Sequence, residues 1–138
     1  MPAQIVIEPI GVVRSALRNR RDAPNQAFEG APEAVLEIAP ALAPALHRVT
    51  PGTELIVVTW LHQADRGILQ VHPMDDEAIP LTGVFATRSS DRPNPIGLHR
   101  VRVIDIQHPA RVRVEAIEAI DGTPIVDLKV AMGRAPDA

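Results

Sequence analysis

The residues best suited to binding a small charged ligand lie in segment 83–98, GVFATRSSDRPNPIGL. Pro93 and Pro95 fix their own φ angles and disfavour the α conformation at the residues before them. Four polar side chains stand on this stiff loop: Arg88, Ser89, Arg92 and Asn94. Because little ordering cost remains on binding, such a loop can form one wall of a pocket. Without a ligand, it would be a rigid corner between strands.

Three side chains are candidate general bases: His62, His99 and Asp121. A histidine such as His62, directly after an apolar run, is also typical of a strand boundary with a satisfied hydrogen bond. An aspartate before glycine, as at Asp121, is also typical of a turn. His62, His72 and Asp65 could form a metal set, but strand spacing does not align them, so we predict no metal site.

Charge and composition narrow the classes of function. The 138-residue chain has a net charge of −3 and no cysteine, which argues against bulk nucleic-acid binding and excludes thiolate chemistry. Two arginine clusters depart from this balance: Arg14, Arg18, Arg20 and Arg21, then Arg88, Arg92, Arg100, Arg102, Arg111 and Arg113. Such clusters favour a focused anionic ligand or solvated strand faces. Without a G-x-G-x-x-G motif, a long apolar run or a signal sequence, we predict no Rossmann-type site, no membrane span and a cytoplasmic location.

Short strands must position these residues. Val and Ile total 28 against 10 Leu, which favours strands, and 14 prolines oppose long helices. We predict strands at 4–13, 34–38, 54–61, 67–72, 83–87, 98–106, 111–117 and 125–130, with a short helix at 40–47. Trp60 is expected in the core, and residues 14–31 form a long loop. Residues 1–138 therefore predict one mainly β domain, an antiparallel barrel or sandwich.

Further motifs accompany segment 83–98. The chain carries IGVVRS at 10–15, PNQ at 24–26, an apolar strand ending in a histidine at 56–62, and IDGTPIVDLK at 120–129. In this order the motifs resemble the TsaA-like family, whose members are also called YaeB, VirR or TrmO. The resemblance spans most of the chain. It implies a single-sheeted antiparallel β-barrel with one or two short helices, a homodimer, and S-adenosylmethionine bound outside a Rossmann framework.

The resemblance also implies an activity and its residues. Members methylate N6 of threonylcarbamoyl-adenosine in the anticodon loop of transfer RNA, so transfer RNA is the expected substrate. Carried over by position, cofactor contacts fall on Pro24, Asn25, Gln26, His62, Gln63, Arg88, Leu98, Glu115, Ala116, Ile117 and Glu118. Substrate contacts are expected at Arg14, Arg92, Asn94 and Thr123, and the expected catalytic residues are His62 and Asp121.

The residue chemistry is compatible with this cofactor. Arg88 could bind its carboxylate through two parallel hydrogen bonds, and Glu118 or Asp121 could bind its ammonium. Leu98 and Ile117 could enclose the adenine between apolar surfaces. The first arginine cluster would steer phosphates, so RNA affinity should fall steeply with salt. Barrel edges that need cover also favour a dimer.

The chain departs from the family pattern at several positions. Asn25 replaces an arginine, Ser90-Asp91 replaces the usual Ser-Pro-x, His99 stands where the family has serine, and Val130-Ala131 replaces Pro-Tyr. These departures touch substrate identity more than cofactor binding. Two alternatives therefore stay open: a cofactor-binding or RNA-binding module without catalysis, and a methyltransferase that acts on a small molecule.

Overall fold

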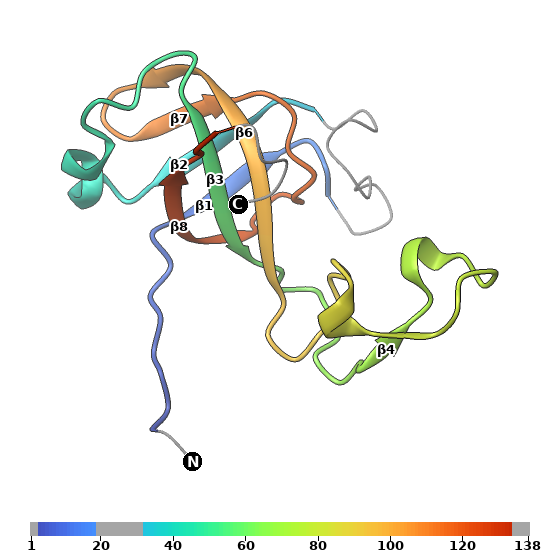
Figure 1. Cartoon of the computed structure of the whole chain (residues 1–138). Helices are drawn as coiled ribbons and strands as arrows, with labels where there is room; N and C mark the ends of the chain where they lie inside the picture. The colour runs from blue at the N-terminus through green and yellow to red at the C-terminus, as the bar shows by residue number, and fades with distance from the viewer. Residues whose placement is uncertain (1–2, 19–31, 134–138) are drawn as a thin grey trace.

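Six antiparallel strands form the main sheet of the protein. The computed structural model describes residues 3–18 and 32–133. The strands are β1 (Gly11–Ser15), β2 (Ala34–Ile38), β3 (Glu54–Trp60), β6 (Ile96–Gln107), β7 (Arg111–Val114) and β8 (Pro124–Val130). They pair in the order β1-β2-β7-β6-β3-β8, and β8 also pairs with β1, so the sheet closes as a barrel (Figure 1). The prediction of a mainly β, antiparallel chain is confirmed.

Alternating burial along the strands explains why these sequences form a sheet. On β2 the side chains of Ala34, Leu36 and Ile38 are buried, whereas Val35 and Glu37 between them are only partly covered. Along β6 the same period of two separates an inward face from an outward face. The buried aliphatic side chains of all six strands form one core inside the closed sheet. Full burial of each such side chain stabilises the fold by about 1.5–3 kcal/mol.

The ladder between β1 and β8 has fewer residue pairs than any other ladder of the closed sheet. Two residue pairs make up its ladder: Gly11 with Ile125 and Val12 with Pro124. The backbone N–H of Ile10 extends it by donating to the carbonyl of Ile125 at 2.8 Å. On the other side of β1, a Cβ atom at Gly11 would overlap the carbonyl oxygen of Glu37. Glycine is therefore required where β1 approaches β2.

Between β3 and β6 the chain leaves the main sheet. Residues 61–95 carry a two-stranded ladder, β4 (Gln70–Val71) with β5 (Thr82–Gly83), and two 3₁₀ turns, η3 (Pro73–Asp75) and η4 (Val84–Ala86). Figure 1 shows this segment projecting from the ends of β3 and β6. The predicted short helix is present as a 3₁₀ helix, η2 (Pro40–Leu46). No helix in the described ranges is long and apolar enough to cross a membrane.

Three predicted strands are confirmed only in part, since β1, β4 and β5 cover a few of their residues, and one predicted core residue is not in the core. Within the described residues, 3–9 belong to no ladder, and Ile5 and Val6 are 81% and 82% exposed. The strand predicted at 67–72 shrinks to β4, and 83–87 contains η4. Trp60 is only partly buried at the end of β3. Local composition gives β propensity, but a strand forms only where a neighbouring backbone supplies its hydrogen bonds.

Candidate functional site

One end of the closed sheet gathers the loops that carry the predicted site. At this end β1, β3 and β7 finish while β2, β6 and β8 begin, as the cross-strand registers show. We name it the site end; its loops lie at the right and lower right in Figure 1. The predicted residues placed here are Arg14, His62, Gln63, Arg88, Arg92, Asn94, Leu98, Glu115, Ala116, Ile117, Glu118, Asp121 and Thr123. Pro24, Asn25, Gln26, Arg20 and Arg21 lie outside the described residues.

His62 and Gln63 occupy the centre of a tight turn directly after β3. The turn closes where the N–H of Ala64 donates to the carbonyl of Leu61 at 3.0 Å. The N–H of Leu61 in turn donates to the carbonyl of Pro95 at 2.7 Å, which ties the turn to residues 84–95, the proline-rich loop. Both central side chains are exposed, and His62 has no hydrogen bond or ion pair within the described residues. His62 is therefore an imidazole that solvent can reach.

The guanidinium of Arg92 stabilises the proline-rich loop itself. Its NH2 group donates to the carbonyl of Val84 at 2.7 Å, and its NH1 group donates to the carbonyls of Ser89 at 2.9 Å and Thr87 at 3.3 Å. These bonds fold the loop around the side chain. A substrate contact through Arg92 is therefore not expected, whereas Arg88 on the same loop is exposed.

Arg66 is a residue that the sequence reasoning missed. Its Nε donates to the carbonyl of Pro93 at 2.7 Å, and its NH2 donates to Oδ1 of Asn94 at 3.0 Å. The guanidinium also lies over Trp60, 5.1 Å from the ring centroid. Arg66 therefore fastens the end of β3 to the proline-rich loop. No local motif signalled this role, because its partners lie 27 and 28 residues further along the chain.

Asp121 is held through both carboxylate oxygens. Oδ1 accepts the backbone N–H of Ser15 at 3.0 Å, and Oδ2 lies 3.2 Å from NH1 of Arg18. These contacts fasten the turn before β8 to the end of β1, so Asp121 is poorly placed to accept a substrate proton. Thr123 is 1% exposed, and its hydroxyl donates to the carbonyl of Ile120 at 2.7 Å. A substrate contact through the Thr123 side chain is therefore not expected.

The segment after β7 runs beside the first half of β6 and brings a carboxylate to a buried histidine. The N–H of Glu115 donates to the carbonyl of Arg102 at 2.9 Å. His99 on β6 is 5% exposed; its Nδ1 lies 2.7 Å from Oε1 of Glu118 and its Nε2 lies 2.7 Å from Oγ1 of Thr59. A hydroxyl, an imidazole and a carboxylate from three neighbouring segments therefore form one continuous chain of hydrogen bonds.

Leu98 and Ile117, expected to enclose the adenine, lie on different faces of the sheet. Ile117 is fully buried in the core, whereas Leu98 is 37% exposed on the outer face. An apolar groove of about 220 Å³ surrounds Leu98, and its lining residues are Ile56, Val58, Leu98, Lys129, Val130 and Met132. Only the Leu98 side chain can contact a ligand, so the predicted enclosure by both residues was wrong.

The arginines of β6 and β7 are paired with acidic side chains. The ion pairs are Glu54 with Arg100 (2.8 Å) and Arg102 (3.1 Å), Glu37 with Arg14 (3.3 Å) and Arg111 (3.0 Å), and Arg113 with Asp105 (3.2 Å) and Glu33 (3.5 Å). Opposite charges facing each other across strands stabilise a sheet modestly. These arginines therefore lie on solvated strand faces, where acidic side chains balance their charge, and they do not form a continuous positively charged surface.

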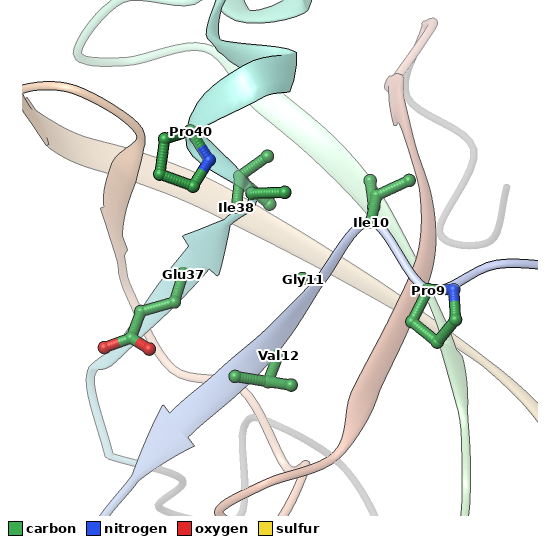
Figure 2. Close-up of a pocket in the computed structure, with 8 residues that line it drawn as sticks. Pro9, Ile10, Gly11, Val12, Glu37, Ile38 and Pro40 are labelled. Carbon is green, nitrogen blue, oxygen red and sulfur yellow. The ribbon is translucent and has the colours of Figure 1, made fainter.

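A second hollow, of about 350 Å³, lies where β1 begins and β2 ends (Figure 2). Its lining residues are Pro9, Ile10, Gly11, Val12, Glu37, Ile38, Ala39 and Pro40. Among these described lining residues, Glu37 alone has an ionisable side chain; its carboxylate points away from Ile10 (Figure 2) and pairs with arginines. Among the residues that the structure describes, the other side chains that line this hollow are apolar.

The described residues contain no cluster of three histidine or acidic side chains that could hold a metal ion. His72, part of the metal alternative, has its Nδ1 2.9 Å from the carbonyl oxygen of Ile79. The histidines and the aspartate of that alternative therefore do not converge.

The family follows from comparison with known proteins. A family model described as the tRNA-methyltransferase O N-terminal domain matches residues 12–135. The chain belongs to this family. The resemblance seen in the motifs is thereby confirmed.

Known proteins resemble the chain over most of its length. A Methanothermobacter thermautotrophicus protein named a probable S-adenosyl-L-methionine-binding protein is 37% identical over 126 residues, covering 91% of this chain and 89% of that protein. An Archaeoglobus fulgidus protein named an S-adenosyl-L-methionine-binding protein is 38% identical over 127 residues, covering 91% and 88%. A crystal structure of TrmO from Pseudomonas aeruginosa matches with a TM-score of 0.76 and 28% identity, covering 100% of this chain and 61% of that one. The chain thus spans about three fifths of that TrmO chain.

Proposed function

We propose that the chain is an S-adenosylmethionine-dependent methyltransferase that acts on transfer RNA. The observation that carries the proposal is the convergence of the family's motifs at the site end of the sheet. The turn at His62, the proline-rich loop and the segment at Glu118 are far apart in sequence, yet they flank the same ends of β3 and β6. The names of the two archaeal relatives support the choice of cofactor.

The side chains of the site end fit the chemistry of S-adenosylmethionine. Arg88 is exposed and can bind the cofactor's carboxylate through two parallel hydrogen bonds. Glu118 can bind the ammonium, because its Oε2 has no partner within the described residues. Asp121 is a weaker candidate, since both of its oxygens are engaged. Leu98 offers an exposed apolar surface to the adenine. The bound cofactor supplies a methyl group activated by its positive sulfur.

Among the predicted catalytic residues, we assign the proton acceptor to His62. Its imidazole is exposed at the site end, whereas Asp121 is held by Ser15 and Arg18. Methyl transfer from a sulfonium needs in-line placement more than acid–base help. A base still assists when the acceptor nitrogen loses its proton. His62 would then accept that proton, while the turn and the proline-rich loop position the two reactants.

The acceptor we propose is N6 of threonylcarbamoyl-adenosine in the anticodon loop. The family's description as a tRNA methyltransferase domain and the likeness to a TrmO structure support this choice. A cofactor-binding module without catalysis is the second candidate. Two side chains expected to act on the substrate, those of Asp121 and Arg92, already make contacts inside the fold, and this favours a module without catalysis.

Transfer of a labelled methyl group from S-adenosylmethionine to transfer RNA tests the proposal. The substrate is transfer RNA that lacks this methylation, and the digested nucleosides are analysed by mass spectrometry. We expect threonylcarbamoyl-adenosine to gain the mass of one CH₂ group. Label on another nucleoside would overturn the acceptor alone. Cofactor binding without label in any transfer RNA would favour the module, and label in the small-molecule fraction of an extract would favour a methyltransferase that acts on a small molecule.

We also propose that two copies associate. The closed sheet removes one reason for this, because a sheet whose end strands pair has no edge that needs cover. The apolar residues at and after the end of β8 give another, because Val130 and Met132 are 62% and 79% exposed. Light scattering at micromolar concentration should give twice the chain mass, and Val130→Asp should lower it. A monomeric mass for the wild type would contradict the dimer. The cytoplasmic location stays a prediction.

A further inference from the structure

A buried imidazole controls the position of the Glu118 carboxylate. His99 is 5% exposed and its two ring nitrogens each make one contact of 2.7 Å, to Glu118 and to Thr59. Two short hydrogen bonds in opposite directions fix both the place and the rotation of the ring. Oε1 of Glu118 is therefore held from the inside of the sheet, while the side chain as a whole is 22% exposed.

The chemistry of the partners sets the direction of these hydrogen bonds. An ionised carboxylate only accepts, so Nδ1 of His99 carries a hydrogen and donates to Oε1 of Glu118. In the neutral ring Nε2 is then an acceptor, and the hydroxyl of Thr59 donates to it. Thr59 is fully buried on β3. Because a hydroxyl can donate as well as accept, Thr59 can pair with Nε2 while the carboxylate of Glu118 keeps the hydrogen on Nδ1.

Glycine at position 97 makes room for this arrangement. Gly97 lies on β6 directly opposite Thr59. A Cβ atom there would lie 2.5 Å from Oγ1 of Thr59 and 2.8 Å from Nε2 of His99. Because real Cβ atoms do not approach polar atoms so closely, the hydroxyl and the ring can meet only beside glycine.

We propose that His99 is a positioning residue that holds Glu118 so that its second oxygen binds the ammonium of the methyl donor. This inference rests on the proposed function. Oε2 has no partner within the described part of the chain, so it can receive a cation. A carboxylate already fixed by an imidazole loses less conformational freedom when it binds. His99 does not touch the donor and acts only through Glu118.

Calorimetry with three probes tests the proposal on the full chain. S-adenosylmethionine carries the ammonium and the sulfonium, S-adenosylhomocysteine carries only the ammonium, and 5′-methylthioadenosine carries neither. In His99→Leu we expect affinity for the first two to fall about tenfold or more, and affinity for the third to stay within about twofold. His99→Asn, whose amide can donate from near the Nδ1 position, should restore most of the loss.

Each other pattern of binding overturns the proposal. An equal loss for all three probes would mean that His99 only supports the fold, and no loss would mean that it does not position Glu118. A loss for S-adenosylmethionine alone would place the carboxylate at the sulfonium. If His99→Leu fails to fold, Glu118→Gln removes the charge but keeps the shape, and the same selective loss is expected.

Nitrogen-15 NMR of the cofactor-free protein separates this inference from the proposed function. We expect Nδ1 of His99 to carry the hydrogen that it donates to Glu118, as in the Nδ1–H tautomer. The opposite tautomer would overturn the hydrogen-bond chain even if the cofactor binds. If the wild type binds none of the probes, the proposed function fails, whatever the tautomer. If it binds S-adenosylmethionine without the selective loss in the variants, only the positioning role fails.

Discussion

The imidazole of His62 is accessible and lies in a turn that the backbone fixes to the proline-rich loop. Residue type and position left His62, His99 and Asp121 as equal candidates for the general base. Their roles separate only in space, because Ser15 and Arg18, which engage Asp121, lie more than 100 residues away in sequence. Thr59 is a polar residue in the apolar run ELIVVTWL, which weakly indicates a buried hydrogen bond, but its partner His99 lies 40 residues away and cannot be inferred from that run.

Replacing His62 tests the assignment of the proton acceptor. We expect His62→Gln to lower methyl transfer by about 10²-fold or more, because general base catalysis typically contributes that much. Cofactor affinity should fall far less, since glutamine can still form hydrogen bonds. Asp121→Asn serves as the comparison and should reduce stability by about 1 kcal/mol with only a small loss of transfer. A larger loss of transfer in Asp121→Asn would reverse the two roles.

Gly11 tests whether the close approach of β1 to β2 limits the fold. We expect Gly11→Ala to destabilise the protein by about 1–3 kcal/mol or more, because the new Cβ meets backbone atoms that cannot turn aside. Gly83→Ala is the matched control, since nothing lies within 4 Å of its Cβ position and its φ is −62°. Urea unfolding of both variants measures the difference, and equal stabilities would contradict the predicted overlap.

Individual elements were predictable where one face of a strand is buried. The strands at 34–38, 54–61 and 98–106 were predicted to within a few residues of β2, β3 and β6, because their apolar residues follow the sheet's period or fill its core. The apolar segment at 5–7 has the same composition but no backbone partner among the described residues. Segment 83–87 contains the 3₁₀ turn η4, and the carbonyls of Val84 in this turn and of Thr87 after it accept hydrogen bonds from the Arg92 guanidinium. Long-range partners of this kind decide the outcome, and a local window does not contain them.

Trp60 offers a direct probe of how β3 is fastened to the proline-rich loop, because it is the single tryptophan of the chain. We expect Arg66→Ala to shift Trp60 emission to longer wavelength and to lower the free energy of unfolding by about 1 kcal/mol. Arg66→Lys keeps a cation near the ring but loses the two hydrogen bonds of the guanidinium. Its emission wavelength and its free energy of unfolding should therefore lie between those of the wild type and of Arg66→Ala. Unchanged emission in Arg66→Ala would show that the contact over the ring is absent in solution.

At the scale of the whole molecule, the order of the motifs in the sequence was enough to identify the family. The distribution of charge on the surface was not evident from the sequence. The arginines of β6 and β7 looked like a basic stripe in sequence. Registers between distant strands place Glu37 and Glu54 beside them, so most of this charge is already balanced. The closure of the sheet through β1 and β8 also depends on such registers. Neither follows from composition or spacing.

The paired arginines change the expected salt dependence of RNA binding. The sequence predicted a steep fall in affinity, but six of the ten arginines in the described residues pair with acidic side chains. We therefore expect a shallow slope of about −2 in log affinity against log salt, as for two or three phosphate contacts to a single strand. Filter binding over a range of salt measures it. A slope near −5 would show that the cross-strand ion pairs open to contact RNA.

Binding of S-adenosylmethionine at the site end is the claim on which the others depend, and titration calorimetry measures it directly. We expect the wild type to bind the cofactor, and Arg88→Ala to bind it about tenfold or more weakly, because a charged hydrogen-bond partner of the carboxylate is lost. Arg111→Ala removes an arginine whose pair, Glu37, lies away from the site end, and it should bind as the wild type does. No measurable binding to the wild type, or an equal loss in both variants, would contradict this assignment.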